Sequence, residues 1–115
     1  MSILNKNFKK EIKAHAKSEE PNECCGVIYQ NKEGQYKLLK CKNVATDKQN
    51  YFEVDAMNYL KASREGEIKG YYHSHVNDSK GEFSDMDLGI CRAHGLSLVM
   101  YSMLQDKFFE INYDQ

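Results

Sequence analysis

The amino-acid sequence predicts an α+β fold, layered α-β-α, in which helices flank a mixed β-sheet. Near the N-terminus, apolar residues recur four positions apart, as they do on the buried face of a helix. Further along, short apolar runs of strand length are bounded by glycine, asparagine or aspartate. In the second half, strand-like and helix-like segments alternate, and such alternation places helices against a sheet.

The first half of the chain predicts a helix followed by a two-stranded hairpin. The helix covers residues 5–18, and Pro21 follows its end. Its apolar row comprises Leu4, Phe8, Ile12 and Ala16. Residues 21–29 form a turn that enters a strand of about five to seven residues. A turn at residues 31–34 then leads into the returning strand Tyr36–Cys41.

The second half predicts two helices and three longer strands. The expected segments, in chain order, are a polar loop at 43–50, a short extended segment at 51–54, a helix at 56–64, a strand at 68–75, a helix at 84–94, and strands at 96–101 and 107–113. Asp55 is the expected N-cap of the first of these helices, and Gly95 ends the second. Met57, Tyr59 and Leu60 are expected to pack inward from the helix at 56–64.

Length and composition predict one globular domain that spans residues 1–115. Hydrophobic residues make up 41% of the chain and charged residues 29%, which suits a modest core. The 16 basic and 17 acidic residues are spread along the sequence, so a nucleic-acid-binding protein with a basic stripe is not expected. There is neither an apolar run of membrane-spanning length nor a secretion signal, so we expect a cytoplasmic protein without membrane contact.

The four cysteines form no Cys-x-x-Cys pair and are expected to be reduced. They are Cys24, Cys25, Cys41 and Cys91. Their simplest role is that of small buried hydrophobic residues. A thiol enzyme that uses Cys24 or Cys25 beside a histidine stays an alternative, although no local signature supports it.

A His-x-His pair in the strand at 68–75 is the feature most indicative of chemistry. His73 and His75 are two residues apart, so both imidazoles leave the same face of the strand while Ser74 points away. Two imidazoles need another ligand to hold zinc firmly, and Asp87 suits this role in the first turn of a helix capped by Ser84. Three protein ligands leave a fourth position for water, which is typical of a catalytic zinc site.

Each of these residues also has a simpler interpretation. Ser84 and Asp87 fit an ordinary N-capping pattern, and a single strand histidine is more often solvated or packed in a core. Glu23 could be a solvated turn residue, and His94 suits the end of a helix. The combination favours the metal site, because the motifs lie at short range from one another.

These motifs together resemble those of the JAMM, or MPN-plus, zinc metalloproteases. That family has a glutamate, then His-Ser/Thr-His, then Ser-x-x-Asp, which correspond here to Glu23, residues 73–75 and residues 84–87. The family often shows Pro-x-Glu-x-Cys-Gly around the glutamate, and residues 21–26 read Pro-Asn-Glu-Cys-Cys-Gly. The resemblance covers nearly the whole chain and implies the MPN/JAMM fold, whose arrangement is like that of cytidine deaminases.

The resemblance also implies a role for each matching residue. His73, His75 and Asp87 would bind one Zn²⁺ per chain. Glu23 would be the general acid/base that activates the metal-bound water, and Ser84 would hydrogen-bond the oxyanion. The implied reaction is hydrolysis of a peptide or isopeptide bond in a protein or peptide substrate.

The sequence is most similar in style to the short prokaryotic and phage members, some of which form the N-terminal domain of a tail-assembly protein. Phage tail proteins are therefore expected partners, and the virion is a second expected location. Two departures from the family pattern stand out: Val76 replaces the usual proline after the second histidine, and the loop before Ser84 is one residue longer. Asp78 and Asp85 are alternative ligands to Asp87. A non-catalytic scaffold, as in family members that have lost the metal, is the alternative function.

Overall fold

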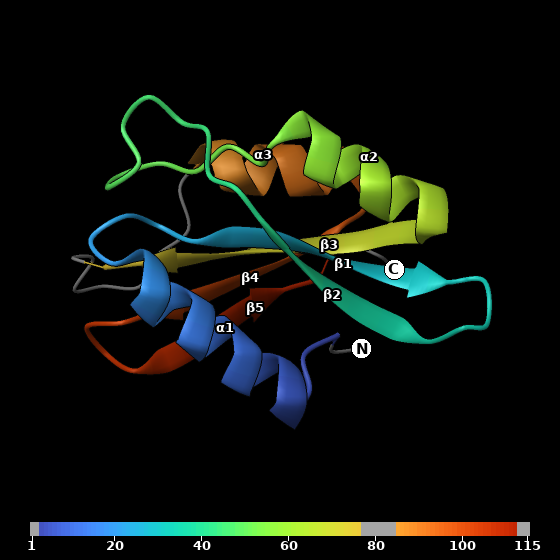
Figure 1. Cartoon of the computed structure of the whole chain (residues 1–115), viewed down its shortest axis with the longest axis horizontal. Coiled ribbons are helices and arrows are strands. Elements are labelled where there is room, and N and C mark those ends of the chain that lie inside the picture. The colour runs from blue at the N-terminus through green and yellow to red at the C-terminus, as the bar shows by residue number, and fades with distance from the viewer. Residues whose placement is uncertain (1–2, 77–84, 113–115) are drawn as a thin grey trace.

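The computed structural model describes residues 3–76 and 85–112, which form five strands and three helices (Figure 1). The elements are α1 (Lys6–Glu19), β1 (Cys25–Asn31), β2 (Tyr36–Cys41), α2 (Ala56–Glu65), β3 (Gly66–His75), α3 (Asp85–His94), β4 (Ser97–Ser102) and β5 (Lys107–Ile111). Each expected helix and strand is present, with its bounds displaced by a few residues at most. The largest displacements are at β1, which extends to Asn31, at β3, which begins at Gly66, and at β5, which ends at Ile111.

The sheet is mixed, as the sequence predicts. Its strand order is β2-β1-β3-β4-β5, in which β3 and β4 run parallel and all other neighbours run antiparallel. Helix α1 lies on one face of the sheet, and α2 and α3 lie on the other (Figure 1). The predicted α-β-α layering is therefore confirmed.

Helix α1 covers its face of the sheet with the apolar row that the sequence shows. Asn5 caps the helix by accepting a hydrogen bond from the backbone N–H of Phe8. Phe8, Ile12 and Ala16 are buried in a core cluster that includes Tyr72 of the sheet. Burial of this row removes apolar surface from water. Such burial is the main favourable contribution to protein folding in general.

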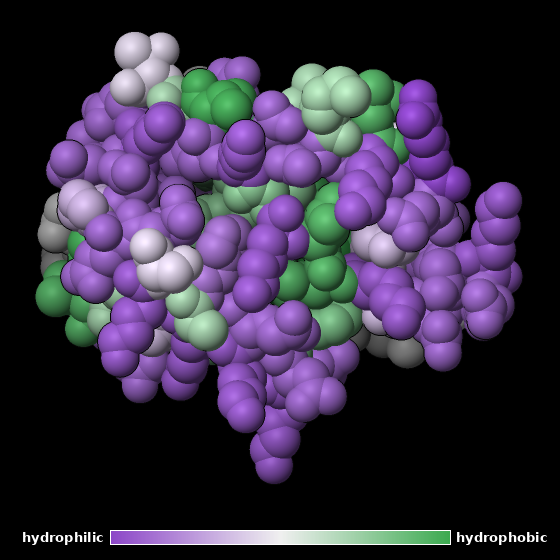
Figure 2. All heavy atoms as spheres, viewed as in Figure 1, coloured by the Kyte–Doolittle hydropathy of each residue, from purple (hydrophilic) through white to green (hydrophobic). Residues whose placement is uncertain are grey.

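Helix α2 packs differently from the prediction. Met57 and Leu60 are 70% and 43% exposed, whereas Ala62 is fully buried; Tyr59 is 37% exposed and stacks on Tyr71 with ring centroids 6.4 Å apart. The prediction of inward packing is therefore wrong for Met57 and Leu60. The reason is helical geometry: successive residues turn by about 100°, so Leu60 lies on nearly the opposite side of the helix from Ala62. Figure 2 shows apolar side chains on the surface over α2.

Candidate metal centre

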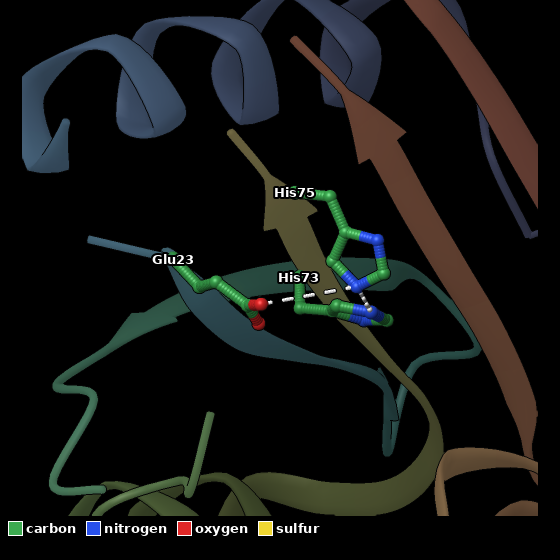
Figure 3. Close-up of side chains that lie close together, drawn as sticks. All are labelled: Glu23, His73 and His75. Atoms are coloured by element: carbon green, nitrogen blue, oxygen red, sulfur yellow. Dashed lines mark hydrogen bonds and ion pairs between the residues drawn. The ribbon is translucent and has the colours of Figure 1, made fainter. Parts of the chain in front are cut away.

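Three side chains that are distant in the sequence meet where β3 ends (Figure 3). They are Glu23, which precedes β1, and His73 and His75, which are the last residues of β3 facing α2 and α3. One donor atom from each lies within 4.8 Å of the other two. A carboxylate and two imidazoles are common zinc donors, so this group is chemically suited to hold a metal ion.

The pairing of β1 with β3 explains why these residues meet. Cys25 lies opposite His73 in the antiparallel pair. Glu23 is two residues before Cys25 and His75 is two residues after His73, so these two residues lie side by side on the same face of the sheet. Ser74 points to the other face, as predicted. Its hydroxyl accepts a hydrogen bond of 2.8 Å from the N–H of Cys24, and its own N–H donates to the Cys24 carbonyl at 3.1 Å.

The two imidazoles are close enough to share one ion. The Nε2 atoms of His73 and His75 are 3.1 Å apart. Zinc–nitrogen bonds of 2.0–2.1 Å at a tetrahedral angle would separate two ligand nitrogens by about 3.3 Å. The Oε2 atom of Glu23 lies 3.9 Å from Nε2 of His75, so the carboxylate lies beside the two imidazoles.

The environment of His73 keeps its imidazole neutral. The ring is fully buried and stacks on Phe52, with centroids 4.5 Å apart and planes 16° apart. Burial, together with the neighbouring His75, holds the pKa of His73 well below its ordinary value. A neutral imidazole has a lone pair that can bind a metal, so no proton has to be displaced from this ring near neutral pH.

The segment between β2 and α2 forms hydrogen bonds with both the backbone N–H and the backbone carbonyl of Glu23. The N–H of Glu23 donates to the carbonyl of Lys48 at 2.7 Å, and the amide nitrogen of Asn43 donates to the carbonyl of Glu23 at 3.0 Å. The same amide nitrogen also donates to the carbonyl of Tyr51, the residue before Phe52. Sequence analysis assigns no role to Asn43 or Phe52, because a polar loop and a short extended segment carry no signal of what they will contact.

The other two predicted site residues cannot be placed in the same way. Asp87 lies in the first turn of α3, as expected, but its side chain is outside the described part of the chain. Ser84 lies wholly outside the described residues, and so does Asp78. The side chain of Asp85, the other alternative ligand, is not described either. Among the predicted site residues whose side chains the structure describes, Glu23 and the two histidines lie together.

All four cysteines are buried and reduced, as the sequence predicts. Burial raises the pKa of the Cys24 thiol to about 12, and it raises the pKa of Cys25 further still. The thiolate is the reactive form of cysteine, so these two residues are poor nucleophiles near neutral pH. This finding argues against the thiol-enzyme alternative. Among the residues that the structure describes, no helix is long and apolar enough to cross a membrane.

Two comparisons with known proteins bear on this site. The sequence pattern of the Prok-JAB family, described as prokaryotic homologs of the JAB domain, matches residues 6–112. The chain is also 32% identical, over 82 residues, to the tail tip assembly protein K of Escherichia phage N15. That alignment covers 71% of this chain but 33% of the phage protein, so the chain spans about one third of its relative. The matched region of the family pattern includes all the predicted site residues.

Proposed function

We propose that this chain, which belongs to the prokaryotic homologs of the JAB domain and is similar to a phage tail tip assembly protein, is a zinc-dependent hydrolase of peptide or isopeptide bonds. The observation that carries this proposal is the meeting of Glu23, His73 and His75 within 4.8 Å. Two imidazoles that can bind zinc, with a carboxylate beside them that can accept a proton from water, suit the hydrolysis of an amide bond.

The proposed ligands of zinc are His73, His75 and Asp87. The 3.1 Å separation of the Nε2 atoms supports this role for the two histidines. The position of Asp87 in the first turn of α3 supports it as the third ligand. A zinc ion bound there would polarise the scissile carbonyl and make a water molecule more acidic. The stack of the partly buried Phe52 on His73 fixes the plane of the imidazole and covers one face of that ring.

The proposed general acid/base is Glu23. Its side chain is only 5% exposed, and its carboxylate lies 3.9 Å from the ligand nitrogen of His75. From this position it takes the proton of the attacking water and delivers it to the leaving amine. We assign Ser84 the hydrogen bond to the oxyanion, a role suited to a hydroxyl near the developing charge.

The biological setting follows the relative. The phage N15 protein is named as a tail tip assembly protein, so we propose that this chain acts on, or together with, tail proteins in the host cytoplasm or the virion. Residues 1–115 would act as a single domain there. No role in binding nucleic acid or a membrane is part of this proposal.

Metal content of purified protein is the first test. Mass spectrometry should find about one zinc per chain in the wild type, and the metal should be lost in His75→Ala because one of three ligands is missing. His94→Ala is the matched control, since His94 is an exposed residue at the end of α3. Wild-type protein that holds no metal and binds none on titration would refute the zinc site and favour a non-catalytic scaffold.

A second variant separates metal binding from hydrolysis. Glu23→Gln should retain zinc, because Glu23 is not a proposed ligand, and should lose turnover of any substrate that the wild type cleaves by a factor on the order of 10² or more. Equal rates for the variant and the wild type would refute the role of Glu23. Loss of zinc from the variant would instead make Glu23 a ligand.

A further inference from the structure

A groove on the α1 side of the molecule is lined mainly by lysines. It has a volume of about 510 Å³ and lies between α1 and the start of β5. Its lining residues are Lys6, Lys9, Lys10, Lys13, Lys107, Asp106 and Phe108, and we call this feature the lysine groove. Helix α1 lies on the opposite face of the sheet from α2 and α3, so the groove is separate from the metal centre (Figure 1).

The lysine groove concentrates positive charge in a chain that is nearly neutral overall. Its five lysines face a single carboxylate, whereas the whole chain has 16 basic and 17 acidic residues. Hydrophilic side chains project from the surface over α1 in Figure 2. Four of these lysines are spaced three or four apart within residues 6–13, whereas Lys107 is distant along the chain and joins them only through the fold.

The one carboxylate in the groove is already engaged. Asp106 accepts a hydrogen bond of 2.6 Å from the hydroxyl of Tyr101 and lies 3.2 Å from the ammonium nitrogen of Lys13. Both contacts hold the pKa of Asp106 below its ordinary value, so it stays charged and paired with Lys13. Among the residues that the structure describes, the other four lysines of the groove form no ion pair with a carboxylate.

The floor of the groove is aromatic. Phe108 is half-buried, and its ring lies 4.8 Å from that of Tyr101. The ammonium nitrogen of Lys9 lies 5.8 Å from the centroid of Phe108, and that of Lys13 lies 5.9 Å from the centroid of Tyr101. Contacts of this kind hold the ammonium groups near the rings. The lysine side chains therefore lose less conformational entropy when a ligand binds.

We propose that the lysine groove docks an acidic protein segment that carries one apolar side chain. The lysines would pair with the carboxylates of the segment, and Phe108 would receive the apolar side chain. Lys6 and Lys13 are seven residues apart on the helix, which corresponds to about 10 Å, or about three residues of extended chain. This inference is independent of the proposed hydrolase activity.

The surroundings of the groove favour a protein segment over nucleic acid. Nucleotide bases can also stack on an aromatic ring such as Phe108, so the difference lies in the charges around the groove. A phosphate backbone would continue past the groove towards Glu11, Glu19 and Glu20, whose carboxylates are exposed on or beside α1. A short acidic segment ends before it reaches them.

The test is the binding of a labelled acidic peptide with a central phenylalanine, measured by fluorescence anisotropy. The variant Lys9→Glu/Lys10→Glu should bind about tenfold more weakly than the wild type, since two attractive charges become repulsive. The matched control is Lys32→Glu/Lys37→Glu on the exposed β1–β2 hairpin, which should bind within about twofold of the wild type. If the groove variant misfolds by circular dichroism, Lys9→Gln/Lys10→Gln replaces it.

Two comparisons decide the kind of partner. A peptide with serine in place of the phenylalanine should bind more weakly, and a single-stranded DNA of similar charge should bind more weakly than the acidic peptide. No binding of the acidic peptide at low salt, or equal losses in the groove and hairpin variants, would overturn the proposal. Tighter binding of DNA than of the peptide would overturn it as well, because the groove would then serve nucleic acid.

Discussion

Replacing Asn43 with alanine should loosen the segment that holds both Glu23 and Phe52 at the metal centre. The side chain of Asn43 forms four hydrogen bonds of 3.0–3.1 Å: its amide nitrogen donates to the carbonyls of Glu23 and Tyr51, and its carbonyl oxygen accepts from the N–H groups of Ala45 and Glu53. The amide nitrogen also donates a longer bond of 3.5 Å to the carbonyl of Lys48. Alanine removes all of these interactions, and the four short bonds are the main loss.

The expected loss of stability follows from the number of bonds and from their exposure. A hydrogen bond of this kind contributes about 0.5–1.5 kcal/mol. Asn43 is only partly buried, so water replaces some of the lost bonds, and we expect the free energy of unfolding to fall by about 2–4 kcal/mol. For a chain of this length, such a loss lowers Tm by roughly 10 °C.

Urea unfolding followed by circular dichroism measures this change, with Asn50→Ala as the matched control. Asn50 lies in the same segment, but its side chain forms a single exposed hydrogen bond, to Asp47. We expect the control to lose no more than about 0.5 kcal/mol. Amide exchange supplies a local readout, because the N–H groups of Glu23 and Glu53 should exchange faster in Asn43→Ala than in the control.

The reasoning would be refuted by similar stabilities of the two variants. If Asn43→Ala and Asn50→Ala unfold within about 0.5 kcal/mol of each other, the four bonds contribute nothing beyond what water supplies. Unchanged exchange at Glu23 would show that the contact with Lys48 holds this residue without help from Asn43.

Three further changes test other parts of the structure. Gly26→Ala should destabilise the fold by about 1–3 kcal/mol in urea unfolding, because the added Cβ would clash with the ring of Tyr72. Gly89→Ala is the control: no atom lies within 4 Å of the added Cβ, so this variant should be neutral or stabilising. Burial lowers the pKa of His15, so the free energy of unfolding should fall as the pH drops below about 6.5, and this slope should become shallower in His15→Gln. Addition of a chelator should lower the Tm of zinc-loaded wild type and leave that of the metal-free protein unchanged, as differential scanning fluorimetry would show.

The sequence alone determines most of the secondary structure, because the local signals agree with the fold. The apolar row of α1 and the expected cap at Asp55 correspond to the observed helices. The alternation of His73, Ser74 and His75 also predicts correctly which side chains share a face, since strand geometry imposes a period of two whatever the strand contacts.

The tertiary structure decides what these elements contact. The register of β1 against β3 brings Glu23 level with His75, and no local pattern near Glu23 specifies that register. The same holds for Asn43 and Phe52, whose contacts depend on how the segment after β2 returns to the sheet.

Tertiary packing also determines which side of α2 faces the sheet. Met57 and Leu60 suggest one buried face, but the small Ala62 lies against the sheet instead. The lysine groove is the clearest case, because Lys107 reaches the lysines of α1 only when β5 takes its place at the edge of the sheet. Periodicity acts between neighbours in the chain, whereas register, helix orientation and charge clustering depend on contacts between residues far apart, and these are set by packing of the whole core.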